Sequence, residues 1–137
     1  MGVVYYANYL IWMEVARTEW CRAQGFTYRD MEEQDGVLMV VAEANCRYLS
    51  PAKYDDEVII KTWLEEAHGR MLRVAYEVRL AADDRKLATG FTRHAFITRD
   101  LRRTQLPRKY FAIFGIVPRP SAAPPSSDTV RSACPSP

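Results

Sequence analysis

The chain has 137 residues, and a chain of this length forms one domain. Its hydrophobic fraction of 48% is large enough for a buried core, while its net charge of +2 is too small to indicate a nucleic-acid-binding protein. The sequence contains no apolar run of the roughly 20 residues that span a membrane and no secretion signal, so we expect a cytoplasmic protein without a membrane span.

The cysteines indicate neither a metal site nor a disulfide. Cys21, Cys46 and Cys134 are scattered, odd in number and match no zinc-binding or disulfide spacing. Cys21 and Cys46 are typical of small buried hydrophobic residues in a reducing compartment. We therefore expect no metal and no cofactor.

The first part of the chain predicts an amphipathic helix that ends near Gly25, a residue suited to the position after a helix. The apolar stripe consists of Leu10, Met13, Ala16 and Trp20, widened by Ile11 and Val15. Arg17 and Glu19 fall on the polar side. Glu14 lies beside the stripe, so its carboxylate is either solvated at the border or held in a site.

Four strand-like segments follow an acidic linker over residues 26–36. They cover residues 37–49, 58–65, 72–80 and 86–99, and they are separated by polar turns at 50–56, 68–69 and 82–85. In the third segment Leu72, Val74, Tyr76, Val78 and Leu80 alternate with charged residues. One long helix and a four-stranded antiparallel meander predict an α+β fold in which the helix covers the concave face of a curved sheet.

The character of the sequence changes after Arg99. A basic cluster consists of Arg99, Arg102, Arg103, Arg108 and Lys109. It is either a solvated surface or an anion site, for which phosphate is the usual ligand. Residues 110–117 are apolar, and their place is not evident. From Pro118 onward Pro, Ser and Ala dominate, which predicts a disordered tail. We therefore divide the chain into a domain over 1–109 and an extension over 110–137.

The motifs now described resemble the hotdog-fold acyl-CoA thioesterases, in particular the 4-hydroxybenzoyl-CoA thioesterase-like, YbgC-type branch. That branch carries Asp-x-x-Gly-Val-Val-Tyr-x-x-x-Tyr-Leu and then Glu-x-x-Arg, which match residues 2–10 and Glu14 to Arg17. Weaker matches follow in order at 48–56, 90–94 and 106–107. The resemblance covers residues 2–107 and implies a hotdog fold and hydrolysis of a small or medium acyl-CoA, by homodimers or homotetramers with active sites at the subunit boundary.

The resemblance also implies roles for individual residues. The backbone N–H of Tyr6, helped by Tyr5, would stabilise the thioester oxygen at the helix N-terminus. Glu14 is a second catalytic candidate, and burial would raise its pKa. The turn at Gly2, Val3 and Val4 would contact substrate, as would two residues of the last strand. These are Arg93, which could pair with coenzyme A phosphates, and His94, for which a backbone-bonded strand histidine is the alternative.

The motif carboxylate of the family, counted back from Gly2, would lie two residues before Met1, and the family's first strand would lie before it too. Two interpretations follow. Either Met1 is an internal methionine of a longer thioesterase, or the chain starts there and is a weak or inactive module that binds acyl-CoA. A hotdog dehydratase or hydratase ranks third, because His68 and His94 both fall on the sheet.

Overall fold

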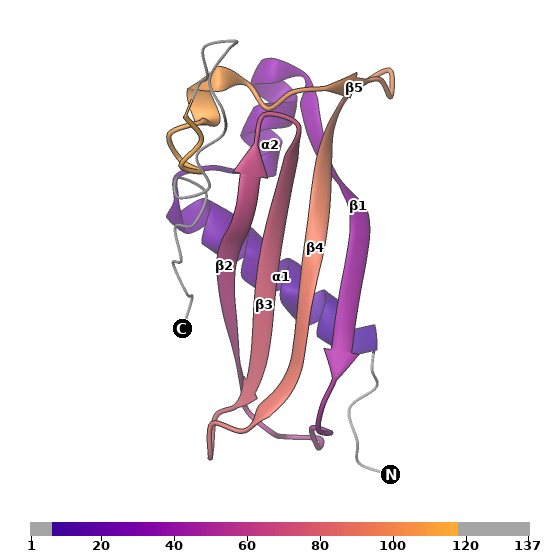
Figure 1. Ribbon diagram of the computed structural model, residues 1–137, viewed down its shortest axis with the longest axis vertical. Helices are drawn as coiled ribbons and strands as arrows, with labels where there is room; N and C mark the ends of the chain where they lie inside the picture. The colour runs from indigo at the N-terminus through magenta and orange to yellow at the C-terminus, as the bar shows by residue number, and fades with distance from the viewer. Residues whose placement is uncertain (1–6, 118–137) are drawn as a thin grey trace.

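The computed structural model describes residues 7–117, which form one long helix against one antiparallel sheet (Figure 1). The helical elements are α1 (Ala7–Ala23), α2 (Tyr28–Asp30), the π-helix η1 (Met31–Asp35) and the 3-10 helix η2 (Arg108–Tyr110). The strands are β1 (Val37–Tyr48), β2 (Val58–His68), β3 (Met71–Leu80), β4 (Lys86–Thr98) and β5 (Arg103–Thr104). The predicted α+β class is confirmed.

The strand order is β1-β4-β3-β2, with the short β5 paired to the end of β4. The predicted four-strand meander is therefore wrong for β1, which lies against β4 instead of β2. Val37 is opposite Thr98, and Tyr48 is opposite Ala88. Sequence alternation reports which face a residue occupies but not which strand is its neighbour, and the loop over residues 49–57 is long enough to carry the chain to the other edge.

Helix α1 crosses one face of the sheet diagonally (Figure 1), as the sequence predicted. Its buried residues are Tyr9, Met13, Arg17, Trp20 and Cys21. The predicted apolar stripe is wrong in part, because Leu10, Ile11 and Val15 are exposed. The buried face is rotated relative to the prediction because the guanidinium of Arg17 finds hydroxyl partners inside the protein.

Gly90 on β4 lets α1 approach the sheet closely. A Cβ atom there would lie 2.4 Å from the backbone oxygen of Asn45 on β1 and 2.8 Å from Cε of Met13 on α1. Any larger residue would force the neighbouring strand or the helix away. The alternation predicted for β3 is confirmed on the same face, where Leu72, Val74, Tyr76, Val78 and Leu80 are all buried.

The apolar segment after residue 109 packs into the core. Phe114 is fully buried and lies 5.3 Å from the ring of Phe26 and 6.0 Å from that of Trp20, between centroids. The hydroxyl of Tyr110 donates to Asp35, 2.8 Å away. The structured chain thus continues to residue 117, past the boundary predicted at 109, while the predicted tail over 118–137 lies outside the described residues.

Candidate functional site

The N-terminus of α1 is the part of the fold to which the sequence motif leads. The described part of α1 begins at Ala7, directly after residues 2–6 of the matched motif. The first N–H groups of a helix have no partner within it, and the helix dipole favours negative charge there. The structure does not describe residues 1–6, so the predicted contacts of Gly2, Val3, Val4, Tyr5 and Tyr6 lie outside the described residues.

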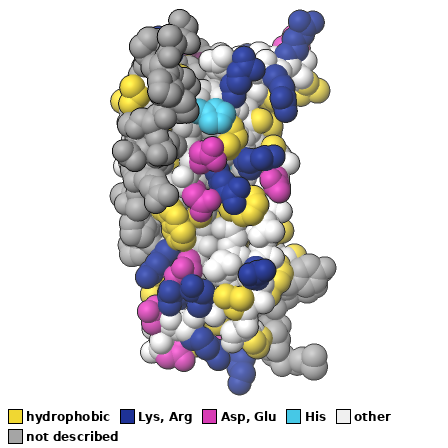
Figure 2. All heavy atoms as spheres, viewed as in Figure 1, with side chains coloured by type: hydrophobic (Ala, Val, Ile, Leu, Met, Phe, Trp, Pro, Cys, Tyr) yellow, Lys and Arg dark blue, Asp and Glu magenta, His cyan; other side chains and the backbone are white. Residues whose placement is uncertain are grey.

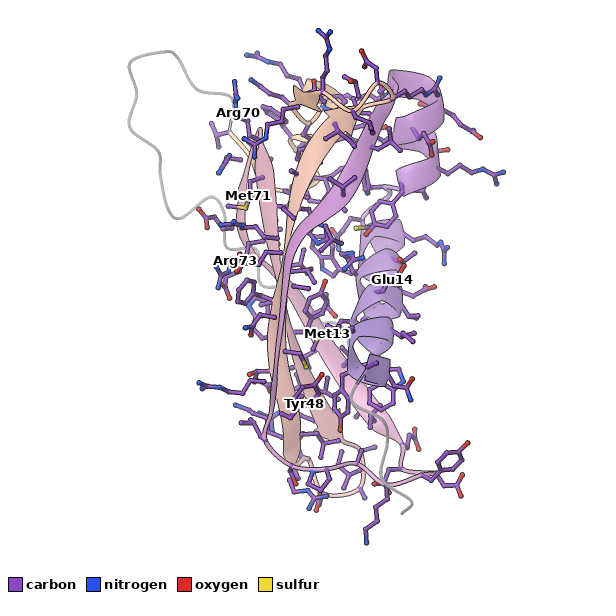
Figure 3. All side chains as sticks on the ribbon, turned by 90° about the vertical axis from the view of Figure 1, so that its right-hand side faces the viewer. Met13, Glu14, Tyr48, Arg70, Met71 and Arg73 are labelled. Atoms are coloured by element: carbon purple, nitrogen blue, oxygen red, sulfur yellow. The ribbon has the colours of Figure 1, made fainter. Side chains whose placement is uncertain are left out.

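Aromatic side chains hold the first turns of α1 against the end of β1. The ring centroid of Tyr9 lies 4.9 Å from that of Trp12 and 5.1 Å from that of Tyr48, in an edge-on contact. Tyr48 and Met13 point into the space between β1 and the helix (Figure 3). The first described turns of α1 are therefore held against β1 by contacts between aromatic rings.

Glu14 lies on the exposed surface of α1, on the side turned from the sheet (Figure 3). The burial predicted for its carboxylate is therefore absent within the described residues. Seven residues separate it from Ala7, which corresponds to about 10 Å along the helix axis. Its carboxylate is too far along the helix to reach the N-terminus of the same α1, and Ile11 and Val15 beside it are equally exposed.

A buried polar network lies between α1 and the sheet. The guanidinium of Arg17 donates to the hydroxyls of Tyr28 at 3.0 Å, Tyr76 at 3.1 Å and Thr92 at 3.5 Å. Tyr76 and Thr92 are bonded to each other at 2.6 Å, and Thr92 is bonded to Nε2 of His94 at 2.8 Å. The prediction that placed Arg17 on the polar surface of the helix is wrong. Its place in the Glu-x-x-Arg motif was the sequence feature that indicated a specific role for this residue.

The network keeps His94 neutral. Burial lowers the pKa of the His94 imidazole to about 3, and the charge of Arg17 acts in the same direction. His94 is 1% exposed and bonds a threonine side chain instead of the backbone partner that the sequence suggested. Burial also raises the pKa of Tyr28 and of Tyr76, so both phenols stay protonated near neutral pH. An imidazole with so low a pKa is a poor proton acceptor near pH 7.

The predicted basic cluster is divided by the fold. Lys109 pairs with Asp35 at 2.9 Å, and Arg99 donates to the backbone oxygen of Glu32 at 2.6 Å. Arg103 instead lies beside Arg93 at a cavity on the sheet face opposite α1. No sequence pattern pointed to the third arginine of that cavity, Arg70, which lies in the β2–β3 turn.

Within the described residues no helix is long and apolar enough to cross a membrane. Over the same residues no group of three or more His, Cys, Asp or Glu side chains could hold a metal ion.

Comparison with known proteins relates the chain to enzymes of coenzyme A chemistry. The model of the thioesterase superfamily matches residues 1–86. The YneP protein of Bacillus subtilis is 42% identical over 78 residues, which are 57% of this chain and 56% of that protein. The acyl-CoA thioesterase YbgC of Haemophilus influenzae is 37% identical over 79 residues, 58% of this chain and 57% of that protein. The match thus spans a little over half the length of these relatives.

Solved structures confirm the predicted hotdog fold. The DHNA-CoA thioesterase of Staphylococcus aureus superposes with a TM-score of 0.77 at 31% identity, covering 83% of this chain and 78% of that one. The 4-hydroxybenzoyl-CoA thioesterase of Pseudomonas sp. strain CBS-3 gives a TM-score of 0.74 at 21% identity, covering 82% and 86%. The second likeness concerns the fold alone.

Proposed function

The chain belongs to the thioesterase superfamily, and from this premise we propose that it hydrolyses the thioester bond of a small or medium acyl-coenzyme A. The observation that carries the proposal is the junction of motif and helix. In the sequence, residues 2–6 of the matched motif directly precede α1, whose first turns Tyr9 and Tyr48 hold against β1. We propose that the protein works in the cytoplasm, in keeping with the free thiols of Cys21 and Cys46.

In this proposal the helix N-terminus stabilises the oxygen of the thioester carbonyl. As a nucleophile attacks the carbonyl carbon, negative charge develops on that oxygen, and the backbone N–H of Tyr6, helped by Tyr5, donates to it. Donors that are fixed before the reaction need no reorganisation during it. One such donor increases kcat by a factor of about 10²–10³. The positive end of the α1 dipole acts in the same direction.

Glu14 is the carboxylate that we propose for acid–base work, acting across a boundary between two copies of the chain. Its distance from the N-terminus of its own helix excludes action there, whereas a second α1 could present its own N-terminus to it. The exposed Leu10, Ile11 and Val15 beside it support a homodimer or homotetramer in which this surface is covered. An interface that covers this surface would hold the Glu14 carboxylate in place for proton transfer.

The test is thiol release from a panel of acyl-CoA esters. We expect turnover by the wild-type chain, and a loss of about 10²–10⁴ in kcat/KM for Glu14→Gln. Glu19→Gln is the matched control, because Glu19 is exposed on the same helix and its one ion pair among the described residues is with Arg22. Equal rates for wild type and Glu14→Gln would refute the role of Glu14.

A second preparation, extended upstream by the gene's own codons, tests where the main carboxylate lies. If only the extended chain turns over, an upstream residue carries the chemistry. Coenzyme A binding without thiol release by either chain would refute hydrolysis and support an acyl-CoA-binding module.

A further inference from the structure

A cavity of about 200 Å³ opens on the sheet face opposite α1. Three arginines line it, together with Ala42, Met71 and Thr104. The arginines are Arg70 in the β2–β3 turn, Arg93 on β4 and Arg103 on β5. Arg70 and Met71 project from this face, away from the helix (Figure 3), and basic side chains gather on its upper part (Figure 2).

The backbone explains why a hollow forms there. The pairing of β1 with β4 shifts register between Val41 and Glu43, so Ala42 has no direct partner and only a methyl group to fill the space. Beyond it β5 pairs with β4, with Thr104 opposite Phe96 and Arg103 next to it. The cavity thus lies where a bulge and a short edge strand leave the sheet surface open.

The charges around the cavity are not balanced within the described chain. Arg93 pairs with Glu43 at 3.4 Å. Neither Arg70 nor Arg103 forms an ion pair with any residue between 7 and 117. By contrast, nearby Arg73 is engaged, because it pairs with Glu65 at 2.7 Å and lies 3.8 Å over the ring of Phe91. Among residues 7–117, two rim guanidiniums therefore have no carboxylate partner and can pair with an external anion.

A fourth positive charge lies behind the sheet. Arg17 is buried, and its hydrogen-bond partners among residues 7–117 are hydroxyls, with no carboxylate to neutralise it. Hydrogen bonds connect Arg17 through Thr92 to the neutral His94, which contributes to the cavity lining. Charges separated by protein interior are screened much less than charges in water. Arg17 therefore adds a buried positive charge on the opposite side of the sheet from the three cavity arginines.

We propose that this cavity binds a phosphate-bearing anion, at a place separate from the N-terminus of α1 in the same chain. Arginine forks suit phosphate oxygens, to which they donate paired N–H groups. The volume is below the 300–1,000 Å³ of sites for larger organic ligands, so it suits a phosphate or pyrophosphate group. That group belongs to a free phosphorylated compound or to the nucleotide end of coenzyme A. The inference does not depend on the proposed hydrolysis.

Isothermal titration with inorganic pyrophosphate tests the site directly. We expect saturable binding by the wild-type chain, weakened about tenfold by Arg103→Gln and by Arg70→Gln, because each loses a charge-assisted hydrogen bond. The matched control is Arg108→Gln, an exposed arginine outside the cavity, for which we expect a change below about twofold. Urea midpoints verify that the variants are folded. Absence of saturable binding, or equal weakening by Arg108→Gln, would overturn the proposal.

A competition experiment identifies the source of the phosphate group. Coenzyme A is titrated into the wild-type chain with and without saturating pyrophosphate. Competition that Arg103→Gln abolishes assigns the cavity to the nucleotide end of coenzyme A, and independent binding assigns it to a free phosphorylated ligand. Both results support the cavity as an anion site. Because binding is measured without turnover, failure of the proposed hydrolysis would leave these results unchanged.

Discussion

The neutral, buried imidazole of His94 predicts a specific loss of stability in mild acid. Its folded pKa of about 3 lies below the unfolded value of about 6.5. The contribution of this group to stability is therefore fully present above pH 6.5 and is lost as the pH falls toward 3. Between pH 7.5 and 4.5 the unfolded chain binds a proton that the folded chain does not, which lowers the free energy of unfolding by roughly 2–3 kcal/mol.

The assay is urea unfolding at pH 7.5 and 4.5, at one protein concentration, for the wild type and for His94→Gln. Carboxylate titration contributes equally to both proteins, so the difference between their pH dependences isolates His94. We expect His94→Gln to lose roughly 2–3 kcal/mol less than the wild type over this range. His68→Gln is the matched control, because His68 is the other histidine of the chain and its side chain is exposed. An equal loss for the wild type and His94→Gln would refute the reasoning.

Three further substitutions test the packing, each read as the free energy of unfolding in urea. Gly90→Ala should lower the free energy of unfolding by about 2 kcal/mol or more, because the new methyl group meets the backbone carbonyl of Asn45. The control Gly69→Ala should lower it by less, because its methyl group meets the flexible side chain of Gln105. Arg17→Met should cost about 1–3 kcal/mol, since it leaves buried hydroxyls without their donor; an unchanged value would contradict the network. Phe114→Ala should lower the free energy of unfolding by about 3–5 kcal/mol, because it empties a buried site. The control Val117→Ala, at an exposed position, should lower it by less than about 0.5 kcal/mol. Similar losses for both variants would argue against a core role for the segment over residues 110–117.

The periodic spacing of apolar residues predicted the long helix and the buried faces of the strands. Alternation placed Leu72, Val74 and Tyr76 on the buried face of β3 because successive strand side chains point to opposite faces. It could not place β1 beside β4, because strand order depends on long-range pairing and leaves no periodic trace. Nor could it predict that Phe114 returns to pack on Phe26, since both segments are short and irregular.

The candidate site could be predicted from the sequence only in part. The motif located the N-terminus of α1, but the roles of Tyr6 and Glu14 rest on resemblance and stay predictions. Polarity misplaced Arg17, because a buried guanidinium needs partners that come from three separate segments, and single-sequence reasoning cannot assemble them. The same limit applies to the cavity, whose arginines Arg70 and Arg103 are distant in sequence and meet only in the folded sheet.

The non-sequential position of β1 has a consequence for the order of assembly. Strands β2, β3 and β4 can join through two short turns, so their pairing closes only small loops. Docking of β1 on β4 instead closes a loop that contains both of those hairpins, and loop closure costs more entropy as the loop lengthens. Amide protons of β1 should therefore exchange with solvent before those of β3, which two strands enclose. Because Ala42 belongs to β1, the arginine-lined cavity is complete only after this last strand has docked.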